Sequence, residues 1–148
     1  MQITEVRIRL LDSRRDRLRA YATITFQHTF VVRDLRIIEG GRGIFVAMPS
    51  RRLADRCPRC ACKNHLRAIF CNDCGVRLPS GRVKKDSQGR ARLHCDICHP
   101  VNKDSRLHVE EIVLARFREE VLKHDQGIYQ PPPDEDFEFE EGTDYESD

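Results

Sequence analysis

Residues 30–52 read FVVRDLRIIEGGRGIFVAMPSRR, and this stretch decides the fold because it contains two extended segments joined by a glycine turn. The first segment is rich in β-branched and aromatic residues and is interrupted at Arg33-Asp34, where we expect a bulge or a bend. The glycines of GGRG predict a tight turn, and the following IFVAM is a second strand that Pro49 ends. The stretch therefore predicts a β-hairpin.

Two more strands precede this hairpin, and a strand and a helix follow it. Residues 3–11 and 18–26 alternate apolar and polar side chains, as half-buried strands do. Residues 91–97 are expected to be a final strand. Asn102 or Asp104 then caps a helix that runs to about His124, and its buried stripe is Val109, Ile112, Val113, Phe117 and Val121. We therefore predict an α+β fold, an antiparallel sheet of about five strands with a C-terminal helix packed on it.

The overall composition favours a cytoplasmic protein with no membrane partner. The chain has 148 residues, of which 39% are hydrophobic and none is Trp. No apolar run approaches the roughly 20 residues that span a bilayer, and the N-terminus has no signal-peptide pattern. Disulfides are rare in the reducing cytosol, so the seven cysteines are more readily explained as metal ligands.

Two C-x-x-C pairs lie in the stretch CPRCACKNHLRAIFCNDC, residues 57–74. Ten residues separate the pairs, and this spacing fits two knuckles that close one tetrahedral Zn²⁺ site. A redox C-x-x-C motif is the rival interpretation, but it accompanies a βαβ pattern that this chain lacks. We therefore predict an inserted zinc ribbon over residues 55–80, followed by a polar linker over 81–91, with the ligands Cys57, Cys60, Cys71 and Cys74.

Three cysteines remain outside this site, and their spacing leaves two interpretations open. Cys62 and His65 are spaced C-x-x-H, and Cys95 and Cys98 are spaced C-x-x-C, so these four side chains could close a second zinc site. Alternatively, the thiols bind no metal, and Cys98 is a small buried side chain. The expected cofactor is therefore one structural zinc ion, or two if the second set is also filled.

Catalysis is not expected, and no catalytic residue is predicted. His99 has no nucleophile with an orienting partner at a recognisable spacing. A catalytic zinc needs an open coordination position, and four cysteines leave none.

The chain's charge is divided into two blocks of opposite sign. Residues 126–148 carry nine acidic groups and no Lys or Arg, which predicts a disordered acidic tail. Residues 1–125 then carry 26 basic and 15 acidic groups, a net charge of +11. Such a body could attract nucleic acid or simply be a solvated surface. The candidate nucleic-acid contacts are Lys103, Arg106, Arg116, Arg118, Arg33, Arg36, Arg82, Lys84 and Lys85.

The run over residues 30–52, with its FVAMPS segment, resembles the SpoVG septation-regulator family (stage V sporulation protein G). The opening ITEVRIR and the D-I-x-H-P-x-N motif at residues 96–102 also resemble that family. The resemblance covers a discontinuous domain, residues 1–54 plus 92–125, and the segment between is an insertion that itself resembles a short zinc ribbon. Ala61, where a Gly is usual, and the extra Cys62 depart from the ribbon pattern.

This resemblance implies a homodimer formed through sheet edges. It also implies binding to DNA or RNA in the regulation of septation, sporulation, transcription or other gene expression, with the helix after the H-P-x-N motif involved in binding. The alternative is a zinc-ribbon adaptor that binds a protein partner through the ribbon or the acidic tail, without binding nucleic acid directly. The residues alone do not separate these two functions.

Overall fold

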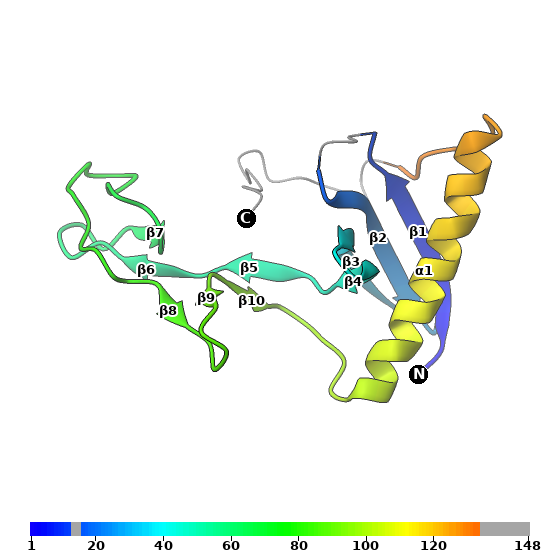
Figure 1. Ribbon diagram of the computed structural model, residues 1–148, viewed down its shortest axis with the longest axis horizontal. Helices are drawn as coiled ribbons and strands as arrows, with labels where there is room; N and C mark the ends of the chain where they lie inside the picture. The colour runs from blue at the N-terminus through cyan, green and yellow to red at the C-terminus, as the bar shows by residue number, and fades with distance from the viewer. Residues whose placement is uncertain (13–15, 134–148) are drawn as a thin grey trace. The chain divides into compact units, whose positions relative to one another are not determined.

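The computed structural model describes residues 1–12 and 16–133 and divides the chain into two compact units (Figure 1). One unit contains Met1–Pro49 and the chain from Cys98 onward, and the other contains Ser50–Ile97. The second unit, Ser50–Ile97, therefore begins and ends a few residues outside the predicted ribbon and linker, residues 55–91. The acidic residues of the predicted disordered tail, 134–148, lie outside the described residues.

The first unit is built on a four-stranded antiparallel sheet in the order β1-β2-β3-β4. Its strands are β1 (Ile3–Leu10), β2 (Leu18–Phe26), β3 (Phe30–Gly40) and β4 (Gly43–Ala47). The bend predicted in β3 is present: the β2–β3 register shifts between Ala22 and Ile24, and Asp34 has a φ of 63°. The glycine turn is also confirmed, because Gly40 pairs with Gly43, whose φ of 119° suits glycine.

The helix α1 (Lys103–Asp125) packs on one face of this sheet (Figure 1). Asn102 caps it as predicted, because its side chain accepts a hydrogen bond from the Ser105 N–H at 2.8 Å. Gly127, with a φ of 74°, follows the helix end and donates to the His124 carbonyl. The helix residues buried against the sheet are Val109, Val113, Leu114 and Phe117.

The sheet has four strands because the last predicted strand pairs elsewhere. Residues 91–97 contain β9 (Ala91–Arg92) and β10 (His94–Asp96), and β10 pairs antiparallel with β5 (Ser50–Arg52) in the second unit. Both β5 and β10 are short and mostly polar, so neither offers an apolar face for the helix-covered sheet. Instead, β5 and β10, which lie at the two ends of the Ser50–Ile97 unit, form backbone hydrogen bonds with each other.

The second unit continues as two further strand pairs. β6 (Ala54–Arg56) pairs with β7 (Lys63–His65), and β8 (Lys84–Lys85) pairs with β9. All of the β8–β9 hairpin except Arg92 lies in the predicted polar linker, so this stretch has a defined structure. The Asp86 carboxylate holds its turn by accepting from the backbone N–H groups of Gln88 and Arg90. These contacts, the Arg90 N–H first, lower the pKa of Asp86.

The chain after α1 is attached to the outer edge of β1. The Tyr129 hydroxyl donates to the Ile8 carbonyl at 3.0 Å and accepts from the Leu10 N–H at 3.0 Å. The Arg9 guanidinium also donates to the Pro132 carbonyl at 2.8 Å. This part of the β1 edge is therefore occupied by the chain itself.

Over the described residues, no helix is long and apolar enough to cross a bilayer.

Candidate functional site

Two tight knuckles in the second unit bring the four predicted zinc ligands together. In the first, the Ala61 N–H bonds to the Cys57 carbonyl at 2.9 Å, and the Cys57 N–H bonds to the Cys62 carbonyl at 2.8 Å. In the second, the N–H of Gly75 bonds to the Cys71 carbonyl at 3.1 Å. Ala61 and Gly75 occupy matching positions, with φ angles of 64° and 74°. Ala61 therefore adopts the left-handed conformation that glycine adopts more easily.

The sulfurs of Cys57, Cys60, Cys71 and Cys74 all lie within 4.8 Å of one another. The Cys57–Cys74 Sγ distance is 3.7 Å, and the Cys60–Cys71 Sγ distance is 3.5 Å. A Zn–S bond of about 2.3 Å in a regular tetrahedron places sulfurs about 3.8 Å apart, whereas a disulfide joins them at about 2 Å. The geometry fits a metal-binding four-thiolate site and excludes disulfides between these pairs.

Backbone and side-chain N–H groups around the sulfurs favour thiolates. Cys71 Sγ accepts from the Asp73 N–H at 3.4 Å and the Asn64 amide at 3.5 Å, and Cys57 Sγ accepts from the Arg59 N–H at 3.3 Å. Donors of this kind, with the Cys74 N–H as the largest cause, lower the pKa of Cys71 to about 5. The Cys60 N–H is the largest cause that lowers the pKa of Cys57.

Cys60 differs from its neighbours in the cluster. The Cys62 N–H lowers the pKa of Cys60, but burial and the three neighbouring sulfurs together outweigh it and raise the pKa to about 12. The neighbouring sulfurs therefore favour the protonated form of the Cys60 thiol in the metal-free cluster. A bound dication would displace that proton, because coordinated thiols are deprotonated.

Asn64 supports the four-cysteine site through hydrogen bonds. An asparagine in the sequence does not by itself indicate this role. Its side chain is buried and bridges the two knuckles. The amide nitrogen donates to the Cys62 carbonyl at 3.1 Å and to Cys71 Sγ, while its oxygen accepts from the Asn72 N–H at 2.8 Å. In the sequence, Asn64 stands four residues after Cys60, a position where the zinc ribbons that this segment resembles also have Asn.

Replacing Asn64 with Ala is expected to weaken metal binding by about 10- to 100-fold, because supporting contacts orient the ligands. The measurement is competition for zinc against a chromophoric chelator. Asn72→Ala is the matched control, since it keeps the backbone N–H that Asn64 contacts and should bind zinc normally. Equal zinc affinities for both variants would show that Asn64 does not support the site.

The second candidate set, Cys62, His65, Cys95 and Cys98, is not gathered in the same way. Among residues 1–12 and 16–133, Cys57, Cys60, Cys71 and Cys74 are the group of three or more potential metal ligands whose ligand atoms lie within 4.8 Å of one another. Cys62 Sγ lies 3.6 Å from the Lys63 carbonyl, and Cys95 Sγ lies 3.7 Å from the Asp96 carbonyl. A second metal stays a prediction.

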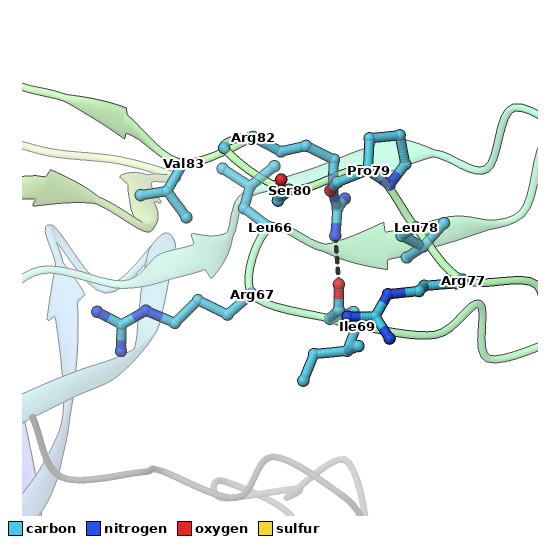
Figure 2. Close-up of a pocket in the computed structure, with 11 residues that line it drawn as sticks. Leu66, Arg67, Ile69, Arg77, Leu78, Pro79, Ser80, Arg82 and Val83 are labelled. Carbon is cyan, nitrogen blue, oxygen red and sulfur yellow. Dashed lines mark hydrogen bonds between the residues drawn. The ribbon is translucent and has the colours of Figure 1, made fainter.

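Arg82, predicted as a nucleic-acid contact, is instead used inside the second unit. Its guanidinium forms an ion pair with Asp55 and donates to the Ala68 carbonyl at 2.6 Å, and its side chain is only 10% exposed. Figure 2 shows this side chain reaching toward the residue 68–69 segment. Arg82 therefore ties the segment after the second knuckle to β6. The neighbouring candidates Lys84 and Lys85 are exposed on β8.

The other candidate nucleic-acid contacts belong to the first unit and differ in their exposure and in their ion pairs. Lys103, Arg106 and Arg118 are exposed on α1. Arg116 is paired with Glu119 at 2.9 Å and with the buried Glu120 at 2.8 Å. The last two candidates lie on β3, where Arg33 is exposed and Arg36 is half-buried.

Comparisons with known proteins agree on one family. The SpoVG family model matches residues 1–119. A septation protein SpoVG of Onion yellows phytoplasma (strain OY-M) is 33% identical over 137 residues, covering 93% of this chain and 94% of that protein. The septation protein SpoVG 2 of Listeria monocytogenes serotype 4b (strain F2365) is 35% identical over 117 residues, covering 79% and 78%. A septation protein SpoVG of Myxococcus xanthus (strain DK1622) is 29% identical over 133 residues, covering 90% and 96%.

Proposed function

Because the chain belongs to the SpoVG family of septation proteins, we propose that it regulates septation, sporulation or gene expression by binding DNA or RNA in the cytosol. In this proposal the protein is a binding protein and not an enzyme. The observation that carries nucleic-acid binding is the basic charge of the second unit, +7 over residues 55–94, together with exposed Lys and Arg side chains of the first unit. Phosphate contacts of Lys and Arg provide most of the sequence-independent affinity of such proteins.

The start of α1 is the best-defined candidate contact in the first unit. Lys103 and Arg106 are exposed within one turn, beside the Asn102 cap. The positive end of the helix dipole adds to their charge and suits a phosphate. Arg118 is a further exposed contact, whereas the ion pairs of Arg116 reduce the charge that it can offer.

The second unit adds a compact basic module. From Asp55 to His94 the chain has ten basic and three acidic residues, a net charge of +7. We propose that Cys57, Cys60, Cys71 and Cys74 hold Zn²⁺, since four thiolates with tetrahedral spacing favour this ion. The role of the metal is structural: it fixes the two knuckles, which have basic residues such as Arg59 and Arg77 within or next to them.

We propose that the expected homodimer forms through one edge of the sheet. Tyr129 occupies backbone groups of β1 at Ile8 and Leu10. At the opposite edge, Ile44 and Phe45 of β4 are 39% and 40% exposed. We therefore propose that two copies pair through β4, where apolar side chains would be buried on association.

The double variant Lys103→Ala/Arg106→Ala is expected to weaken nucleic-acid binding and to make it less dependent on salt. Each lost phosphate contact reduces the slope of log affinity against log salt concentration by about 1, so the slope should fall by about 2. Electrophoretic mobility shifts over a salt series measure this slope. The control Arg42→Ala/Lys123→Ala removes the same charge from the β3–β4 turn and from the far end of α1, and an equal loss in both variants would exclude a local site at the start of α1.

A further inference from the structure

Two large apolar side chains of the second unit are held out to solvent next to a zinc ligand. Ile69 and Phe70 directly precede Cys71 and are 59% and 57% exposed. Their backbone is nevertheless well fixed, because Phe70 pairs with Arg77 as an isolated bridge and the Leu78 N–H bonds to the Ile69 carbonyl at 2.7 Å. The backbone of Ile69 and Phe70 is therefore held in place although their side chains are exposed.

Cationic side chains adjoin both apolar groups. The Arg77 guanidinium carbon lies 5.9 Å from the centre of the Phe70 ring, a cation–π arrangement. Ile69 and Arg77 also line a hollow of about 790 Å³, with Leu66, Leu78 and Val83 as further apolar lining. Figure 2 shows the Arg67 and Arg77 side chains around this hollow. An apolar floor with arginines at its border suits a ligand that is both flat and anionic.

Nucleotides have this chemistry when their bases are unpaired. A base offers an apolar face that can stack on an aromatic ring, and the phosphate beside it can contact an arginine. In a duplex the base faces are stacked on each other and cannot reach Phe70. The net charge of +7 on the surrounding segment adds electrostatic attraction for a strand that extends beyond one nucleotide.

We propose that Phe70, with Ile69, Arg67 and Arg77, is a stacking site through which the zinc ribbon binds single-stranded nucleic acid. This inference rests on the proposed nucleic-acid binding and names the form of nucleic acid that the second unit recognises. One base stacks on Phe70, the neighbouring base enters the hollow beside Ile69, and the arginines contact the connecting phosphates. The contacts proposed on α1, which a duplex can also reach, belong to the first unit.

The test compares three probes on the full-length, zinc-loaded protein by fluorescence anisotropy. The probes are a 12-nucleotide single-stranded DNA, the duplex of the same sequence, and a synthetic peptide of residues 134–148 as an acidic, aromatic polypeptide. Phe70→Ala is expected to weaken single-strand binding about tenfold while changing duplex binding less than twofold. Phe70→Tyr should restore binding, because it keeps a ring for stacking.

Phe30→Ala is the matched control, since Phe30 is a 65% exposed aromatic residue in the first unit. Native mass spectrometry must find the same zinc content in Phe70→Ala as in the unmodified protein. Unmodified protein that binds neither DNA probe, nor RNA probes of the same sequence, would refute the proposed function itself. If single strands bind but Phe70→Ala has no effect, or weakens duplex binding equally, the stacking site is refuted. If Phe70→Ala weakens only peptide binding, this surface is a protein-docking site and the inference is also overturned.

Discussion

Cys71→Ser, or removal of zinc with a chelator, is expected to unfold the Ser50–Ile97 unit while the sheet-and-helix unit stays folded. The second unit has little else to stabilise it. Its buried cluster consists of Cys57, Cys71 and Leu78, with Cys62, Ala68, Cys74 and Val76 partly buried against it. Structural zinc sites in small peptides contribute about 10–16 kcal/mol of apparent binding free energy at neutral pH, so losing the metal should remove most of this unit's stability.

Two-dimensional ¹H–¹⁵N NMR spectra measure this result residue by residue. Amide signals of residues 50–97 should collapse toward random-coil positions, and signals of β1 to β4 and α1 should keep their dispersion. Cys62→Ser is the control, because Cys62 lies outside the four-thiolate cluster. Retained dispersion in metal-free Cys71→Ser would show that the ribbon folds without metal. Native mass spectrometry of the unmodified protein distinguishes one zinc per chain from two.

Leu35→Ala is expected to lower the free energy of unfolding of the first unit by about 2–5 kcal/mol, as large-to-small changes in packed cores do. Leu35 has no exposed surface, pairs with Ala22 on the neighbouring strand, and belongs to the cluster that contacts α1. A small domain is typically stable by about 5–15 kcal/mol, so this change removes a large share of the total.

Urea denaturation followed by helical circular dichroism measures the loss, since α1 belongs to this unit. The midpoint should fall at an unchanged slope. Leu122→Ala is the control, because Leu122 lies on α1 but is 60% exposed, and it should change stability by less than about 1 kcal/mol. Similar losses in both variants would mean that the cluster around Leu35 is not the core that holds the sheet.

Patterns of residues close together in the sequence predicted most of the first unit, because the positions of its strands and helix depend mainly on such patterns. Alternation located β1 and β2, and the Arg33-Asp34 interruption marked the bend of β3. The Asn102 cap and an apolar stripe located α1. The stripe was less exact in its members: Leu114 and Glu120 are buried, whereas Ile112 is only partly buried. Glu120 is tolerated there because Arg116 and Lys123 pair with its carboxylate.

The sequence by itself determined the four strands of the first unit, its helix and the four cysteines that cluster, since each follows from a short-range period or spacing. Only the tertiary structure decided what residues distant in the chain do together. It pairs β10 with β5, joins Arg82 to Asp55 across 27 positions, and places Asn64 between the knuckles. An arginine carries the same positive charge in any sequence. Only its surroundings in the folded protein decide whether that charge forms an internal ion pair or is available to bind a ligand. The physical reason is that such contacts depend on where the folded backbone brings two side chains, which no local pattern records.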